Sequence, residues 1–69
     1  MTLRDMVEQF DIQGRWVVKV WQDDCNDYAI IEQGEDLHPY QLEDAALDAP
    51  VVYMYAIDGC LNIEIDMEV

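Results

Sequence analysis

The residues best suited to chemistry in this sequence are acids that alternate with other residues near its C-terminal end. Glu64, Asp66 and Glu68 are separated by single residues, so in an extended strand their carboxylates share one face and repeat every ~6.8 Å. A nucleic-acid strand presents one phosphate per ~3.4 Å of its axis. The three acids therefore approximate every second phosphate charge, which predicts a surface that recognises positive charge.

The charge of the whole chain supports this interpretation. Its 69 residues include 16 acids and three bases, for a net charge of −13. No base follows Lys19, and the first 20 residues balance three acids with three bases, so the whole net charge lies on residues 21–69. Acidic tails are usually disordered and poor in Val, Ile and aromatic residues, but these acids are interleaved with such residues. A folded domain that tolerates this self-repulsion indicates a functional surface.

Further acids and aromatic residues extend the predicted surface. Tyr53 and Tyr55 are expected beside the acidic ladder, and tyrosine is favoured at the centres of protein interfaces. The alternative is that the acids only keep an exposed sheet soluble and protect an edge strand from pairing. The predicted partner-binding set is Glu64, Asp66, Glu68, Asp23, Asp24, Asp27, Tyr53 and Tyr55.

Catalysis and cofactor binding are not expected. The chain has no serine, and nothing in its sequence places its one histidine, His38, near the thiol of Cys25 or Cys60. It has no glycine-rich phosphate loop and no Cys/His cluster with metal-ligand spacing, so no cofactor and no metal are predicted. An EF-hand loop begun at Asp24 would need a ligand where Tyr28 stands. The negative charge also argues against direct binding of nucleic acid.

The hydrophobic pattern predicts a helix followed by strands. Thr2 and Asp5 resemble a capping box, and apolar residues at i, i+3, i+4 and i+7 predict a helix over residues 2–10. Residues 15–33 are predicted to form a hairpin, because β-branched and aromatic runs flank an acidic turn. A short helix is expected over residues 40–47.

A second hairpin is predicted around Asp58-Gly59, the strongest short hairpin signal. A two-residue turn there pairs Ile57 with Cys60 and fixes the register. One face of this hairpin is then wholly apolar and is expected in the core: Val52, Met54, Ala56, Leu61, Ile63 and Ile65. The other face is expected to pair Tyr55 with Asn62, Tyr53 with Glu64, and Val51 with Asp66.

Together these elements predict one α+β domain over residues 1–69. We expect a four-stranded, mainly antiparallel sheet made of two hairpins, with the N-terminal helix packed on one face. Trp21 shares the outward face of Lys19 and is the tryptophan better suited to a contact surface. The side chains expected to face inward from the first hairpin are Trp16, Val18 and Val20, while Val17 is expected beside Lys19. Phe10 and both tryptophans are interpreted as core or dimer residues.

The sequence also bears on the location of the protein. Its N-terminus lacks a basic region followed by an apolar stretch, and no apolar run approaches the ~20 residues that span a bilayer. Two cysteines are too few for a disulfide framework. A cytoplasmic protein with reduced thiols is therefore expected.

Compactness, strong acidity, strand-borne carboxylates and the hairpin over residues 51–59 together resemble the small anti-defence proteins of phages and mobile elements. In that class, anti-CRISPR and anti-restriction inhibitors often act as DNA mimics. The resemblance implies a non-enzymatic inhibitor that occupies the basic groove of a CRISPR effector or a restriction nuclease subunit. The alternative is a small acidic interaction or dimerisation module without mimicry. An apolar content of 52% favours either a rich core or an apolar surface covered by a second copy in a homodimer.

Overall fold

The first turn of the N-terminal helix is held by the predicted capping box. In the computed structural model, which describes residues 1–67, α1 spans Leu3–Gln9. The backbone N–H of Asp5 donates to Thr2 Oγ1, and the backbone N–H of Thr2 donates to Asp5 Oδ2, both at 3.2 Å. The reciprocal bonds satisfy two N–H groups that a helix otherwise leaves without partners.

Removing this cap should have a measurable cost. We expect Thr2→Ala to lower the free energy of unfolding by about 1 kcal/mol, which in a chain of this size lowers the melting temperature by about 4–8 °C. Thermal unfolding followed by circular dichroism measures the change. Thr2→Ser retains the hydroxyl and should stay near the parent melting temperature; an equal loss in both variants would contradict the capping role.

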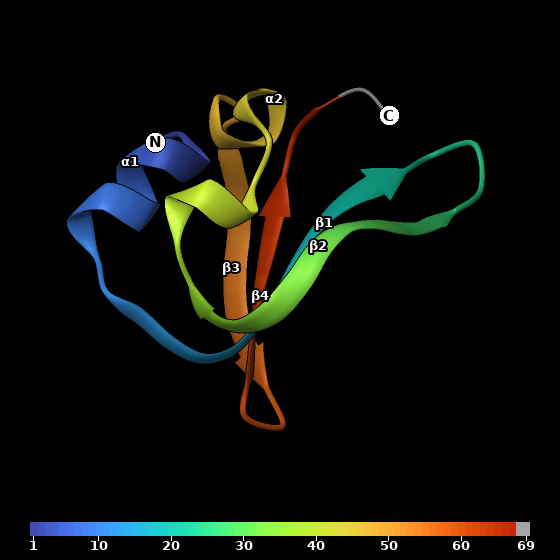
Figure 1. Cartoon of the computed structure of the whole chain (residues 1–69). Coiled ribbons are helices and arrows are strands. Elements are labelled where there is room, and N and C mark those ends of the chain that lie inside the picture. Colours follow the sequence, from blue (N-terminus) through green and yellow to red (C-terminus); the bar gives the residue numbers. More distant parts are fainter. Residues whose placement is uncertain (68–69) are drawn as a thin grey trace.

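Four strands form one sheet in the order β2-β1-β4-β3, as Figure 1 shows. Their bounds are β1 Ile12–Gln22, β2 Asp27–Leu37, β3 Val51–Ile57 and β4 Cys60–Ile65. Both hairpins are antiparallel, whereas β1 and β4 run parallel at the centre of the sheet. The predicted α+β fold with a mainly antiparallel sheet is confirmed. The predicted helix over 40–47 is present as two short turns, η1 (Pro39–Gln41) and α2 (Asp44–Leu47).

The first hairpin is longer than predicted because two glycines lie inside its strands. Gly14 has φ +85° beside a bulge in β1, a backbone conformation that glycine adopts without strain. Gly34 lies opposite Trp16 in β2. A Cβ atom at Gly34 would lie 3.4 Å from the indole ring of Trp16, so this glycine leaves room for a large neighbour and does not end the strand.

The second hairpin turns at Asp58 and Gly59 as predicted, with φ of 51° and 74°, the signs of a type I′ turn. The predicted pairs hold from Ile57–Cys60 to Tyr53–Glu64. Beyond them the prediction is wrong, because an irregularity at Val52 shifts the register and pairs Val51 with Ile65 in place of Asp66.

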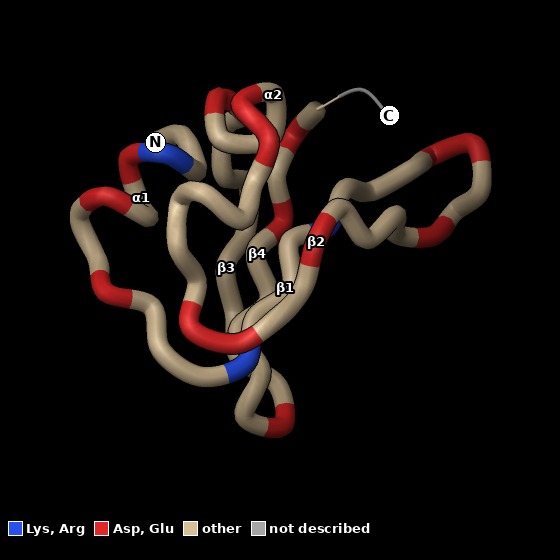
Figure 2. Tube along the Cα trace, viewed as in Figure 1, with Lys and Arg blue, Asp and Glu red and all other residues tan. Residues whose placement is uncertain are grey.

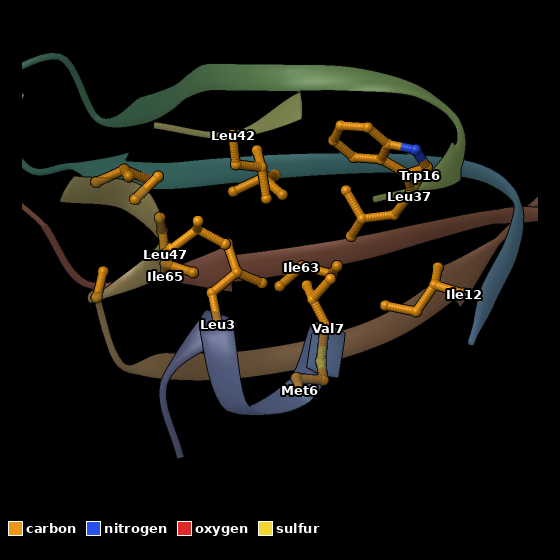
Figure 3. Packing of buried hydrophobic residues seen from close by; sticks show 14 residues of the cluster. Leu3, Met6, Val7, Ile12, Trp16, Leu37, Leu42, Leu47, Ile63 and Ile65 are labelled. Atoms are coloured by element: carbon orange, nitrogen blue, oxygen red, sulfur yellow. The ribbon is translucent and has the colours of Figure 1, made fainter. Parts of the chain in front are cut away.

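The core lies between one face of the sheet and the helical segments (Figure 3). Leu3, Met6 and Val7 of α1 pack into it, and Trp16 is 1% exposed. Phe10, which was interpreted as a core or dimer residue, is exposed and does not belong to the core, because α1 ends at Gln9 and the backbone of Phe10 is extended (φ −122°, ψ 141°). The remaining core residues are Ile12, Val18, Val20, Leu37, Leu42, Ala46, Leu47, Ala49, Ile63 and Ile65.

The prediction of a wholly buried apolar face on the second hairpin is only partly right. Ile63 and Ile65 of the inner strand β4 are buried, whereas Val52 and Met54 are exposed, because β3 is the edge strand of the sheet. Val17, which was expected outward beside Lys19, is buried. It lies on an inner strand between Gln33 and Asn62 and does not belong to the core cluster.

No helix within residues 1–67 has the length and apolar character needed to cross a membrane.

Candidate functional site

The parallel pairing of β1 and β4 brings two acidic segments to one end of the sheet. Parallel strands end at the same edge, so the residues after Gln22 lie near those after Ile65. Asp23 follows the first strand and Asp66 follows the second. The two carboxylates, 43 positions apart in the sequence, therefore line one surface feature.

That feature is a shallow hollow of about 280 Å³, which we call the carboxyl-end hollow. Trp21 forms part of its wall, and its indole N–H donates a 2.6 Å hydrogen bond to Asp23 Oδ1. This bond fixes the orientation of one carboxylate on the hollow. The full lining is Val20, Trp21, Asp23, Val52, Glu64, Ile65 and Asp66.

The one base near the hollow, Lys19, is occupied by a network on the neighbouring open face of the sheet. Its Nζ atom lies 4.2 Å from the ring centre of Tyr28 and 5.0 Å from that of Tyr55. It also donates a 3.2 Å hydrogen bond to Asn62 Oδ1. The lysine charge is therefore stabilised by two aromatic rings and an amide.

Glu64 belongs to the same network and is 8% exposed, the one buried acid within residues 1–67. It lies between Lys19 and Tyr53 in register and accepts a 3.2 Å hydrogen bond from the Tyr28 hydroxyl. A reversal of charge at Glu64 would bury a cation beside Lys19, which is costly. Contrary to expectation, this acid is a structural residue of the open face.

The predicted acidic ladder is therefore wrong as a set of exposed carboxylates repeating along one strand. Glu64 is buried, and β4 ends at Ile65, so the exposed Asp66 lies beyond the strand. Glu68 lies outside the described residues.

The other predicted site residues surround the hollow or extend away from it. Asp24 and Asp27 are exposed at the tip of the β1–β2 hairpin, which projects from the body of the fold (Figure 1). Tyr53 is exposed beside Glu64, while Tyr55 is partly buried next to Lys19. The structure thus brings Asp23, Glu64 and Asp66 together and leaves Asp24 and Asp27 as a separate acidic tip.

Every base of the chain is engaged within the fold, so the acids at this end keep their charge uncompensated. Arg4 forms ion pairs with Asp44 at 3.5 Å and Asp48 at 2.9 Å. Arg15 donates a 2.6 Å hydrogen bond to the backbone carbonyl of Asp58, and Lys19 is held as described above. Figure 2 shows few basic positions and more numerous acidic ones distributed over the helical, strand and loop segments.

The surroundings of Tyr28, which include Glu64, make the stability of the fold depend on pH. Partial desolvation, and then the charge of Glu64 beside the hydroxyl, raise the pKa of Tyr28 above its usual value of 10. The folded state thus disfavours the phenolate more than the unfolded state does. The contribution of the protonated Tyr28 to the free energy of unfolding is therefore complete below about pH 10. It is lost as the pH rises through the pKa that Tyr28 has in the folded state.

Replacement of this tyrosine tests the network. We expect Tyr28→Phe to be less stable than the parent below about pH 10, and the difference to narrow at higher pH. Urea unfolding of both proteins across this range measures the difference. A difference that stays constant with pH would contradict the coupling of Tyr28 to Glu64.

The hollow is suited to binding a side chain, and its chemistry is electrostatic. Its volume lies below the ~300–1,000 Å³ typical of pockets for small-molecule ligands. Residues 1–67 contain no group of three or more His, Cys, Asp or Glu residues placed to hold a metal ion. A tryptophan wall beside two exposed carboxylates matches the requirements of a guanidinium or ammonium group.

The sequence did not lead us to predict the parallel pairing of β1 with β4, which brings Asp23 and Asp66 together. A pattern that indicates this pairing is nevertheless present. Trp21 and Asp23 at the end of one strand have the same spacing as Glu64 and Asp66 at the end of another. Placing Lys19 beside Glu64, as the structure does, aligns the two segments. Without that pairing, the acids look like separate groups.

No protein-family model, no curated protein and no solved structure matches this chain in the comparisons made with known proteins.

Proposed function

We propose that this protein is a non-enzymatic inhibitor that binds a basic, nucleic-acid-binding surface of another protein. The observation that carries the proposal is the carboxyl-end hollow, where Asp23 and Asp66 flank Trp21 while all three bases are engaged elsewhere. The site offers two exposed carboxylates, of which the indole N–H of Trp21 orients that of Asp23.

The proposed mode of binding combines long-range attraction with a local contact. A net charge of −13 accelerates the encounter with a positively charged groove. A basic side chain of the partner then enters the hollow, where it stacks on Trp21 and bonds to Asp23 and Asp66. The exposed Tyr53 adds apolar contact area at the border of the site.

The proposed targets are the DNA-binding or RNA-binding grooves of defence nucleases, such as CRISPR effectors and restriction enzymes. The acids of this chain would take the place of phosphates, so binding of the protein and binding of DNA would exclude each other. We place this activity in the cytoplasm, where such nucleases encounter DNA. The competing proposal is a small acidic interaction or dimerisation module that does not mimic DNA.

Affinity capture followed by competition tests the proposal. The immobilised protein is exposed to a lysate of cells that carry CRISPR or restriction systems, and retained proteins are challenged with duplex DNA. We expect a basic nuclease subunit to be retained and released by the DNA. Retention of a neutral partner that DNA does not displace would overturn the proposal in favour of the module.

A further inference from the structure

The edge strand β3 carries no charged residue, although the chain has a net charge of −13. Its sequence is Val-Val-Tyr-Met-Tyr-Ala-Ile, and Val52, Tyr53, Met54 and Ile57 are exposed. Edge strands of this kind pair with further strands unless charges, prolines or a covering segment prevent it. Within residues 1–67, β3 pairs with β4 on one side and with no other strand.

Within residues 1–67, the N-terminal segment covers the beginning of this edge. The backbone N–H of Val51 donates to the carbonyl of Met1 at 2.9 Å, and Thr2 forms an isolated bridge with Pro50. Among the described residues, no further bridge or backbone hydrogen bond from outside the sheet covers residues 52–56. Because Ile57–Cys60 closes a two-residue turn, the antiparallel alternation directs the backbone groups of Met54 and Ala56 away from β4.

The centre of residues 52–56, Tyr53-Met54-Tyr55, reads the same in both directions, and the residues that flank it are both apolar. Met54 is its centre, with Tyr53 and Tyr55 on either side, then Val52 and Ala56. A two-fold axis through Met54 would pair each Tyr53 with Tyr55 of a second copy. Directly opposite aromatic pairs stabilise antiparallel sheets.

An apolar hollow beside this edge gives the second copy something to cover. It has a volume of about 220 Å³ and is lined by Met6, Phe10, Ile12, Met54 and Leu61. Phe10 is 57% exposed and Met54 is 54% exposed. A second Met54 across the two-fold axis would lie next to the first and shield this apolar surface from water.

The distribution of charge favours a second copy of this chain over a basic protein as the partner of β3. The opposite edge strand, β2, carries Asp27, Glu32, Glu35 and Asp36, so self-pairing there would bring like charges together. At β3 two copies would meet along strands that carry no charge. A basic partner gains no electrostatic attraction from β3 itself.

We propose that two copies of this chain associate through antiparallel pairing of their β3 strands about Met54, which forms one continuous eight-stranded sheet. The association shares Val52 with the lining of the carboxyl-end hollow, but it does not use the carboxylates of Asp23 and Asp66. It responds to salt in the opposite direction from the binding of a basic partner, because salt screens the repulsion between two chains of charge −13.

Sedimentation equilibrium with the complete chain tests this proposal. The protein concentration is varied between about 1 µM and 1 mM, a range that spans moderate to weak affinities. We expect the mean mass to rise from 8.1 kDa to twice that value over this range. Added salt should shift this rise to lower protein concentrations. Met54→Lys should weaken association by at least about tenfold, although it reduces the net negative charge. Ile30→Lys makes the same charge change at the 58%-exposed Ile30 on β2 and should leave association unchanged. A parent chain that stays monomeric, or equal loss in both variants, would overturn the proposal.

Crosslinking tests the register without adding a charge to the strand. In a chain with Cys25→Ser and Cys60→Ser, Met54→Cys would place two thiols across the axis, with Cα atoms about 5.5 Å apart, within the range of disulfides. Mild oxidation should yield a covalent dimer from this variant and none from Ile30→Cys in the same background. Equal yields, or no dimer from Met54→Cys, would contradict pairing about Met54.

Discussion

The double variant Asp23→Lys/Asp66→Lys is expected to lose at least about 100-fold in affinity for the captured partner. Both residues are exposed and line the carboxyl-end hollow, so the replacement turns the site from attractive to repulsive for a basic side chain. Neither residue contributes to the buried core. The loss should therefore occur without a change in fold, and titration calorimetry alongside circular dichroism measures both.

A matched variant separates the site from the overall charge. Glu8→Lys/Asp11→Lys changes the net charge equally, from −13 to −9, at two exposed acids in and just after α1. We expect this control to bind within about tenfold of the parent, because it weakens only long-range attraction. If both double variants lose affinity equally, the hollow is not the site and the partner responds to net charge alone.

The largest effect on stability is expected from Trp16→Ala. Trp16 is 1% exposed and packs in the core against residues of the sheet, and removal of such a ring costs about 3–5 kcal/mol. A chain of this size has a total stability of about 3–10 kcal/mol. We expect the variant to lose about a third or more of its free energy of unfolding, which urea unfolding followed by circular dichroism would show.

The second tryptophan provides the control for this prediction. Trp21 is exposed and contacts Tyr28 edge-on, with ring centres 4.9 Å apart, an interaction worth about 0.5–1.5 kcal/mol. Trp21→Ala should therefore remain folded while releasing Asp23 from its hydrogen bond. Comparable stability of Trp16→Ala and Trp21→Ala would contradict the assignment of Trp16 as the central core residue.

Much of the fold could be predicted from local patterns in the sequence. The capping box at Thr2, the turn at Asp58-Gly59 and the inward positions of Trp16, Val18 and Val20 all follow from residue type and spacing. The errors arose where tertiary contacts decide. Gly34 looks like a strand end but lies against the Trp16 ring, and the irregularity at Val52 shifts the last pairs of the hairpin.

The site was harder to predict because it depends on which strands are neighbours. Alternation alone placed Glu64 and Asp66 on one face, but it could not show that Glu64 is buried beside Lys19 and Tyr28. Nor could it show that Asp23 and Asp66 meet, since that requires the parallel pairing of β1 with β4. The composition of the chain predicts its negative charge. The order of the strands in the sheet then brings part of that charge to the carboxyl-end hollow.

The salt dependence of partner binding tests the central claim most directly. Affinity for the captured nuclease subunit is measured between about 50 and 200 mM salt, for the parent and for Asp23→Lys/Asp66→Lys. If the carboxylates take the place of phosphates, the affinity of the parent should fall steeply over this range. The affinity of the variant should fall less steeply. Parent affinity that stays constant across this range would contradict the proposal that uncompensated carboxylates bind the partner.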